Sequence, residues 1–141
     1  MKFKRLVASV VMGALFSGAA FAQVKVGVIS SSTGPIAMVG IPQKNSVPLM
    51  PTKVGNLTVQ YIPLDDGSDP TASVVAIKKL ISEENVDAII GPSGSPNAMG
   101  VIQFAAEAGV PLLAPVGTAA VVLPMDDKKK WVFKTTQNDQ L

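Results

Sequence analysis

Short apolar runs alternate with longer amphipathic stretches along most of the chain. The apolar runs, rich in valine, isoleucine and leucine, predict strands over residues 24–29, 57–62, 86–90, 111–115 and 131–135. The stretches between them predict helices over residues 36–50, 70–83 and 96–108. Because Pro42 and Pro48 interrupt the first helix, we expect it as short or kinked pieces. Strands alternating with helices predict a doubly wound, mostly parallel α/β sheet, and the uniformly apolar run 111–115 predicts a strand buried on both faces.

Residues that favour helix ends mark the second and third helices. Asp69 is a candidate N-cap, because Pro70 follows it and proline is favoured in the first turn of a helix. Ser95 stands in the same relation to Pro96 and is predicted as the N-cap of the third helix. Gly109 is predicted to end that helix, because glycine readily adopts the left-handed conformation found there.

Small and polar residues follow two neighbouring strands of the predicted sheet. Ser93 and Ser95 come after the strand 86–90, and Val116, Gly117 and Thr118 come after the strand 111–115. In open parallel sheets, ligands bind outside the carboxyl ends of the strands. We therefore predict that a small polar molecule binds at these five residues.

Two other loops suggest chemistry at first sight. The hydroxyl-rich loop 30–35 could hold a carboxylate or phosphate at the start of a helix, or be a plain strand-to-helix turn. It has no P-loop lysine and no GxGxxG spacing, so a nucleotide site is unsupported. The acidic run 65–70 departs from the calcium-loop pattern, because Gly67 stands third in the run and Pro70 sixth. A tight turn into the helix that begins after Asp69 explains it better.

The first 22 residues read as a secretory signal peptide. A basic head is followed by an apolar stretch, and Ala20-Phe21-Ala22 fits the small-residue cleavage pattern, with cleavage expected before Gln23. The alternative is a membrane anchor, for which the apolar stretch is short and the cleavage pattern is unsuited. We therefore expect a periplasmic protein of residues 23–141.

Charge and composition exclude several functions. The chain carries 12 basic and 10 acidic residues. Three of the basic residues lie in the predicted signal peptide, so 9 remain against 10 acidic ones, and the mature net charge of −1 gives no case for nucleic-acid binding. Histidine and cysteine are absent from the sequence, which excludes a His-assisted nucleophile and an ordinary zinc site. We predict no metal and no cofactor.

An enzymatic alternative rests on the segment 91–95, Gly-Pro-Ser-Gly-Ser. It matches the GxSxG pattern of a nucleophile elbow only in part, because its fifth residue is serine. A general base for Ser93 or Ser95 is not evident in the sequence. The chain is therefore predicted not to be an enzyme.

Five segments in this order resemble the periplasmic substrate-binding proteins of ABC importers, specifically the branched-chain amino-acid (Leu/Ile/Val-binding) type. They are GVISSSTGPIAMVG, LDDGSDP, AIIGPSGSPNAMGVIQFAAEAGVPLLAP, GTAA and FKTTQND. Members of this family have two α/β lobes that close on a ligand, and the resemblance covers the N-terminal lobe of this type I fold. It implies residues 23–141 as that lobe, with the second lobe absent from this sequence.

The resemblance also implies roles for individual residues. Ser95 matches the serine that bonds the ligand carboxylate, Thr118 the threonine that holds the amino-acid head group, and the backbone of Val116 a carbonyl that receives the ammonium. Val39 stands where the family often places an aromatic residue that covers the ligand. This difference, together with a shorter first helix broken by proline, alters the expected preference for the ligand's side chain.

The function implied is capture of a branched-chain or hydrophobic amino acid, or a related small carboxylate, and its delivery to an ABC permease in the inner membrane. The alternative is a ligand-sensing domain of a receptor or regulator with the same fold. In both cases the partner is a small molecule, and no covalent chemistry is needed.

Overall fold

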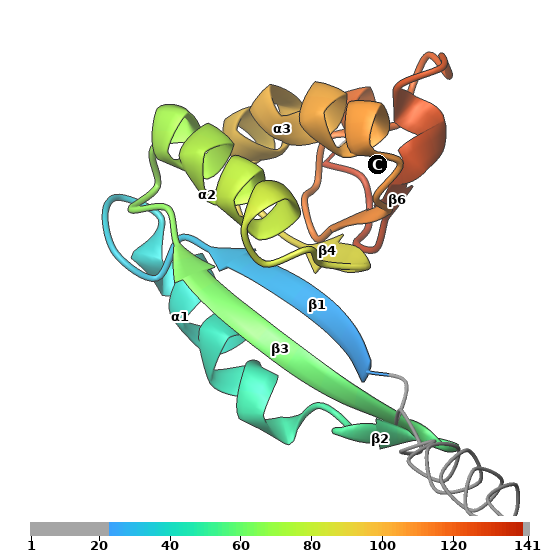
Figure 1. Ribbon diagram of the computed structural model, residues 1–141. Helices are drawn as coiled ribbons and strands as arrows, with labels where there is room; N and C mark the ends of the chain where they lie inside the picture. The colour runs from blue at the N-terminus through green and yellow to red at the C-terminus, as the bar shows by residue number, and fades with distance from the viewer. Residues whose placement is uncertain (1–22, 140–141) are drawn as a thin grey trace, which may run out of the picture.

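The computed structural model describes residues 23–139, so the predicted signal peptide lies outside the described residues. They form one six-stranded sheet with the strand order β2-β3-β1-β4-β5-β6 (Figure 1). All neighbouring strands are parallel except the pair β2–β3. The strands are β1 (Gln23–Ser30), β2 (Lys53–Val54), β3 (Leu57–Asp65), β4 (Ala88–Ile90), β5 (Leu112–Ala114) and β6 (Val132–Lys134). The helices are α1 (Ala37–Ser46), α2 (Pro70–Ser82) and α3 (Ser95–Ala108), with short 3-10 turns η2 (Val47–Leu49), η3 (Ala119–Val121) and η4 (Lys129–Trp131).

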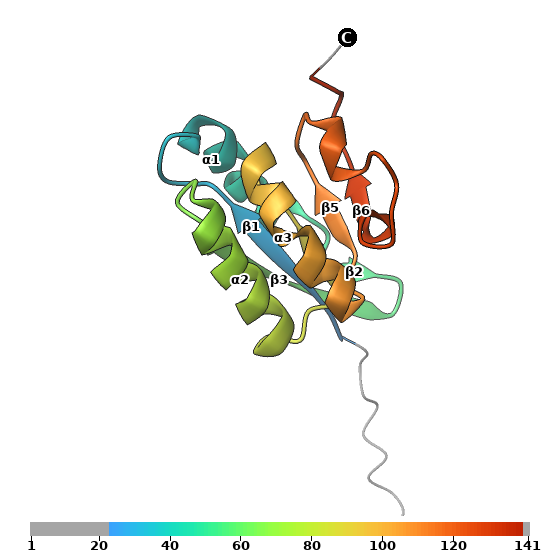
Figure 2. The same ribbon diagram turned by 90° about the horizontal axis from the view of Figure 1, so that it is seen from above.

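Helices cover both faces of the sheet, as predicted for a doubly wound fold. Helices α2 and α3 lie together on one face, and α1 lies on the other, beneath β1 and β3 (Figure 1). Seen from above, α2 and α3 run side by side over the central strands (Figure 2). Among residues 23–139, the structure contains no helix with the length and apolar character needed to cross a membrane.

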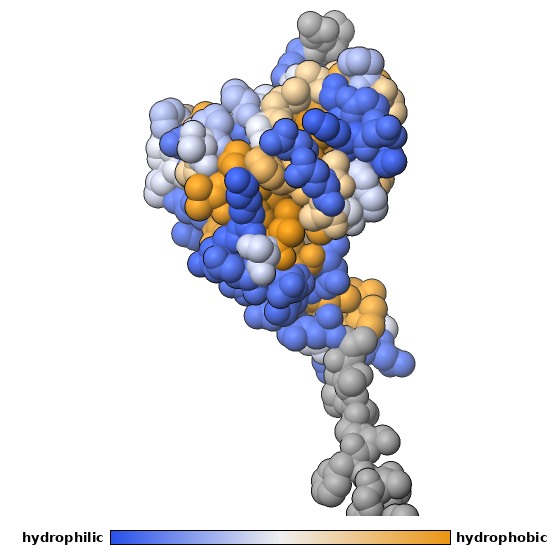
Figure 3. Space-filling view, turned by 45° about the horizontal axis from the view of Figure 1, so that its top comes forward, coloured by the Kyte–Doolittle hydropathy of each residue, from blue (hydrophilic) through white to orange (hydrophobic). Residues whose placement is uncertain are grey.

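The hydrophobic core lies between the sheet and the pair α2 and α3. Ile77, Leu80, Ile89, Val101 and Leu112 are completely buried there. The fit of α2 to β1 is close, because a Cβ placed on Gly27 would lie 2.6 Å from Cδ1 of Leu80. A strip of apolar surface remains visible between the two helices (Figure 3). Across the two helices, the ammonium group of Lys78 on α2 lies 4.7 Å from the centre of the Phe104 ring on α3.

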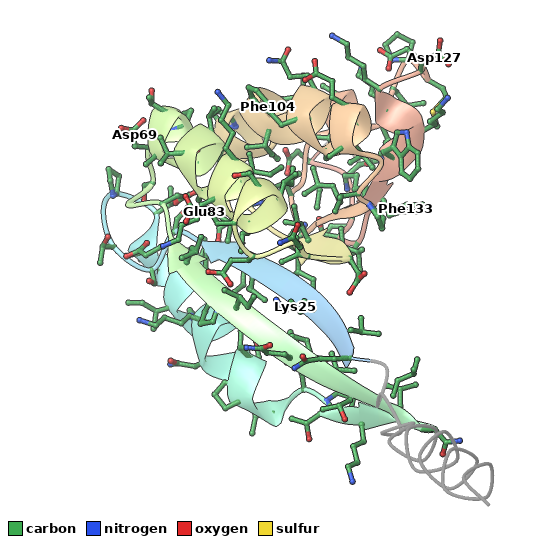
Figure 4. The ribbon with its side chains drawn as sticks, in the orientation of Figure 1. Lys25, Asp69, Glu83, Phe104, Asp127 and Phe133 are labelled. Atoms are coloured by element: carbon green, nitrogen blue, oxygen red, sulfur yellow. The ribbon has the colours of Figure 1, made fainter. Side chains whose placement is uncertain are left out.

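The opposite face of the sheet is covered at one side only. A registered row of side chains, Val28, Ile90, Leu113 and Phe133, crosses β1, β4, β5 and β6 on this face. Val28 is 4% exposed near α1, whereas Phe133 on β6 is 53% exposed (Figure 4). The prediction that the strand 111–115 is buried on both faces was therefore wrong: Leu112 is buried, but Leu113 is only half-buried. The reason is that α1 covers β1 and β3 but does not extend over β5.

The edge of the sheet beside β3 holds one strand that the sequence pattern did not predict. Strand β2 forms a hairpin with β3 in which Val54 pairs with Leu57. Gly55 in the turn has φ +59°, a left-handed conformation that glycine adopts readily. Strand β3 continues through Pro63 to Asp65, further than predicted. Pro63 is tolerated because β2 pairs with only the first two residues of β3, and beyond them Pro63 lies at the outer edge of the sheet.

The predicted helix boundaries are confirmed for α2 and for the end of α3. A side-chain oxygen of Asp69 accepts a hydrogen bond from the backbone N–H of Thr71 at 2.7 Å, which caps α2 (Figure 4). Gly109 ends α3 with φ +67°. The first helical stretch is divided into α1, which contains Pro42, and the short turn η2, in agreement with the predicted short pieces.

Candidate functional site

The carboxyl ends of four neighbouring parallel strands meet at one edge of the sheet. β1 is paired with β3 on one side and with β4 on the other, and β4 is paired with β5. The loops that follow these strands therefore lie next to one another. Ser93 lies in the loop after β4, Ser95 begins the helix that follows this loop, and Val116, Gly117 and Thr118 lie in the loop after β5. Five of the six predicted site residues thus share this edge of the sheet.

Ser95 is not the N-cap of α3, contrary to the prediction. The N-cap is Gly94, whose carbonyl accepts the first hydrogen bond of the helix, from Ala98 N–H at 2.8 Å. The helix begins one residue earlier than expected because Gly94 has the extended conformation of a cap residue. A Cβ on Gly94 would lie 2.7 Å from Oδ1 of Asn97, so glycine fits best there. Half-buried Ser95 is the first residue of α3, at the positive end of the helix dipole.

Ser93 is buried and joins three segments of the chain. Its Oγ accepts a hydrogen bond from the backbone N–H of Ser31 at 3.0 Å, and its hydroxyl donates to Oε1 of Gln43 in α1. Neither partner can remove a proton from Ser93, because a backbone amide and a carboxamide are not bases at neutral pH. This geometry supports a structural role for the hydroxyl rather than that of a nucleophile.

The loop after β5 is contacted by the end of the described chain. Thr136 donates a hydrogen bond through Oγ1 to the carbonyl of Val116 at 2.6 Å, and Asp139 N–H donates to the carbonyl of Gly117 at 3.0 Å. A carbonyl oxygen has two lone pairs, so the Val116 carbonyl keeps one for a further donor. Thr118 caps the turn η3, because its Oγ1 accepts from Ala120 N–H at 3.2 Å.

Val39 lies on α1, apart from the two loops in sequence and on a different element. It is 50% exposed. The next residue, Gly40, packs against the end of β1: a Cβ on Gly40 would lie 2.1 Å from the carbonyl oxygen of Ser31. The structure therefore places the helix that carries Val39 against the same edge of the sheet as the loops. Contact of Val39 with a ligand remains a prediction.

A buried carboxylate beneath the edge was missed at the sequence level. Asp66 is 1% exposed, and its carboxylate accepts hydrogen bonds from the side chains of Ser31 and Ser73 at 2.7 Å each. It also accepts from Asn97 Nδ2 at 2.9 Å and from Ser68 N–H at 3.0 Å. Asp66 thus ties the end of β1 to α2 and to the first turn of α3. The available signal was the pair of acidic residues directly after a strand, which the sequence analysis assigned to a turn.

The neighbouring carboxylate of Asp65 organises the loop after β1. Oδ1 accepts hydrogen bonds from the backbone N–H groups of Ser32 at 3.0 Å and Gly67 at 3.0 Å, and Oδ2 accepts from the Thr33 hydroxyl at 2.8 Å. Partial burial by itself raises the pKa of Asp65, but these hydrogen bonds to the charged form outweigh it and hold the pKa below its ordinary value. Asp65 is therefore a charged anchor for the loop at neutral pH.

Two hollows on the described surface lie away from this edge. One, of about 420 Å³, is lined by residues of the β2–β3 hairpin, including Lys53 and Asn56. The other, of about 330 Å³, lies beside α3 and is lined by Met99, Gln103 and Lys129 among others. The residues of the candidate site instead lie in the loops at the carboxyl edge and at the start of α3.

The chain is similar to known binding proteins in sequence and in structure. Residues 23–140 match the family described as "Periplasmic binding protein". A curated Leu/Ile/Val-binding protein from Rhizobium johnstonii is 30% identical over 125 residues, which are 84% of this chain and 34% of the relative. This relative is a binding protein by name, which agrees with the prediction that the chain is not an enzyme.

Two solved structures are also similar. An extracellular ligand-binding receptor from Rhodopseudomonas palustris HaA2 is 43% identical with a TM-score of 0.82, and the match covers 84% of this chain and 33% of that one. A solute-binding protein of an ABC transporter from R. palustris, solved in complex with 4-hydroxybenzoate, is 31% identical with a TM-score of 0.72, covering 82% and 32%. The chain thus spans about a third of the length of each of these relatives.

Proposed function

Because the chain belongs to the periplasmic binding protein family, we propose that it is the extracytoplasmic solute-binding component of an ABC importer. It captures a branched-chain or other hydrophobic amino acid, or a related small carboxylate. It then presents this solute to a permease in the inner membrane. Residues 1–22 serve as a cleaved signal peptide, and residues 23–141 form the N-terminal of two lobes between which the ligand is held.

One observation supports this proposal most: the start of α3 lies beside the loop that follows β5. Ser95 is the first residue of α3, and the first intrahelical hydrogen bond is made by Ala98, so the backbone N–H groups at the start of α3 point toward the edge. A helix N-terminus favours a carboxylate. The carbonyl of Val116 and the hydroxyl of Thr118, on the neighbouring loop, suit an ammonium group.

The relatives support a carboxylate as the shared feature of the ligand. The relative from R. johnstonii is named for leucine, isoleucine and valine, and the one from R. palustris holds 4-hydroxybenzoate. Both kinds of molecule combine a carboxylate with an apolar body, and only the amino acids carry an ammonium group. In this proposal Ser95 holds the carboxylate, while Val39 borders the apolar body.

Thermal unfolding of the purified chain with leucine, isoleucine and 4-hydroxybenzoate tests the proposal. A ligand that binds the folded state stabilises it by about 2.7 kcal/mol at a hundredfold excess over Kd. We expect a rise in Tm with at least one of these ligands, and its loss in Ser95→Ala and Thr118→Ala. Ser82→Ala, at the far end of α2, is the matched control and should retain the full rise.

An unchanged Tm with every carboxylate tested would contradict capture by this lobe. A rise that persists undiminished in both Ser95→Ala and Thr118→Ala would place the ligand elsewhere on the chain.

A further inference from the structure

One face of α1 and of the residue before it lies against the loops of the candidate site. Ile36, Gly40 and Gln43 are spaced by four and three residues, so they share one side of the helix. A Cβ on Gly94 would lie 2.9 Å from Cδ1 of Ile36, and a Cβ on Gly40 would lie 2.1 Å from the Ser31 carbonyl oxygen. Gln43 makes the third contact, to Ser93. Helix α1 therefore touches both the end of β1 and the loop before α3.

Of the three contacts, only that of Gln43 is a hydrogen bond, which depends on direction as well as distance. Its Oε1 accepts the hydroxyl proton of Ser93, whose oxygen in turn accepts the N–H of Ser31 at 3.0 Å. Ser93 is 7% exposed, so its hydroxyl needs a partner to offset the loss of water. The contacts of Ile36 and Gly40 are packing contacts and fix a distance of approach, whereas a hydrogen bond also fixes orientation.

We propose that Gln43 is a positioning residue that sets the spacing between α1 and the loop 93–95. The consequence of this spacing for ligand binding rests on the proposed function. Val39, which borders the ligand's apolar body, lies one helical turn before Gln43, and Ser95 lies two residues after Ser93. The Gln43–Ser93 hydrogen bond thus joins the part of the site that contacts the apolar body to the part that holds the carboxylate. The length of ligand accepted depends on this bond.

If Gln43 had only a structural role, its replacement would leave the ligand preference of the site unchanged. On a helix face that otherwise carries Ile36, Gly40 and Val47, an apolar side chain of similar length could fill the place of Gln43. Such a replacement would keep the packing of α1 but release the Ser93 hydroxyl. The loop 93–95 would then change its position relative to Val39 without unfolding of the lobe.

The test compares Gln43→Met, which keeps length but removes the amide acceptor, with Gln43→Glu, which keeps an acceptor for the Ser93 hydroxyl. Gln103→Met, at an exposed position of α3, is the matched control. The first readout is hydrogen exchange of the Ser31 amide by NMR, because that amide donates to Ser93. The second is the ratio of Kd for leucine to Kd for 4-hydroxybenzoate.

In Gln43→Met we expect faster exchange of the Ser31 amide and a change of about fivefold in the Kd ratio, the effect of one neutral hydrogen bond. Gln43→Glu should restore slow exchange of the Ser31 amide, because it keeps an acceptor for the Ser93 hydroxyl, and Gln103→Met should alter neither readout. Combining Gln43→Met with Ser93→Ala should add nothing to Ser93→Ala alone.

Unchanged Ser31 exchange in Gln43→Met would overturn the proposal, whatever the ligands do. Faster exchange with an unchanged Kd ratio would also overturn it, because Gln43 would then have only a structural role. If the unsubstituted chain bound no carboxylate, the proposed function would fail, while the exchange data would still decide whether Gln43 positions the loop.

Discussion

The carboxylate of Asp66 accepts a hydrogen bond from Nδ2 of Asn97 at 2.9 Å, and both residues are buried. Asn97 is the third residue of α3, and Asp66 directly follows β3. This bond therefore fixes the start of α3 relative to the end of a neighbouring strand. The fold positions the candidate site through such buried polar contacts as well as through hydrophobic packing.

Asp66→Asn is expected to destabilise the lobe. The carboxylate receives four hydrogen bonds, and a carboxamide would turn an NH₂ group toward donors such as Ser73 and Asn97. We expect a loss of about 3 kcal/mol in the free energy of unfolding, measured with urea, because buried donors would lose their acceptor. Asp127→Asn, at an exposed position, should change it by less than about 0.5 kcal/mol. Equal small effects of the two substitutions would contradict the anchoring role of Asp66.

Two helical glycines should respond in opposite directions to alanine. A Cβ on Gly40 would lie 2.1 Å from the Ser31 carbonyl oxygen, so Gly40→Ala must push α1 away from the sheet edge, at a cost of about 2 kcal/mol. A Cβ on Gly100 meets its nearest neighbour, Val74, at 3.9 Å. Gly100→Ala should therefore stabilise α3 by about 0.5 to 1 kcal/mol. Chemical unfolding of both variants checks the pair, and a tolerated Gly40→Ala would show that α1 is not seated on Ser31.

Asp65 should make stability fall in acid. Burial raises the pKa of Asp65, but hydrogen bonds from Gly67, Thr33 and Ser32 lower it by more. The pKa is therefore lower in the folded state than in the unfolded state. The stabilisation is complete above the unfolded pKa of about 3.9 and is lost as pH falls through the lower folded value. Between about pH 5 and pH 2, the urea midpoint should therefore fall less in Asp65→Asn than in the unsubstituted chain. Parallel pH curves for the two proteins would refute this assignment.

Asp139 should favour ligands that carry an ammonium group. Its backbone N–H donates to the Gly117 carbonyl at 3.0 Å, and a Cβ on Gly117 would lie 1.6 Å from Asp139 Oδ1, so the carboxylate lies against this loop. Asp139→Asn removes the charge at nearly constant shape. We expect binding of leucine to weaken about threefold, the scale of one exposed charge pair, with no loss for 4-hydroxybenzoate. Calorimetric titration measures both, and equal weakening of the two ligands would contradict a role for the charge.

Local signals in the sequence were sufficient for much of the fold. Asp69 before Pro70 and Gly109 after an apolar helix predicted helix ends correctly, because capping depends on a few adjacent residues. The alternation of strands and helices predicted the doubly wound sheet, and the resemblance to branched-chain amino-acid binding proteins is confirmed at the level of the family.

Two of the three errors originate in contacts between distant parts of the chain. Ser95 is the exception: it has the residue type of an N-cap, but Gly94 is the N-cap because of its local backbone geometry and the nearby Asn97 side chain. Exposure of Leu113 depends on how far α1 extends across the sheet, which no local pattern encodes. Asp66 accepts side-chain hydrogen bonds from residues 7 to 35 positions away, so the acidic pair 65–66 indicated a carboxylate after the strand but not its distant partners.

Mapping a bound carboxylate on the chain by NMR tests the central claim most directly. Backbone amide shifts of the labelled protein would be followed during titration with leucine and with 4-hydroxybenzoate. The account predicts that the largest shifts fall on residues 93–98 and 116–118, at the start of α3 and after β5. Saturable shifts confined to the β2–β3 hairpin, residues 53–58, or the absence of any saturable shift, would contradict it.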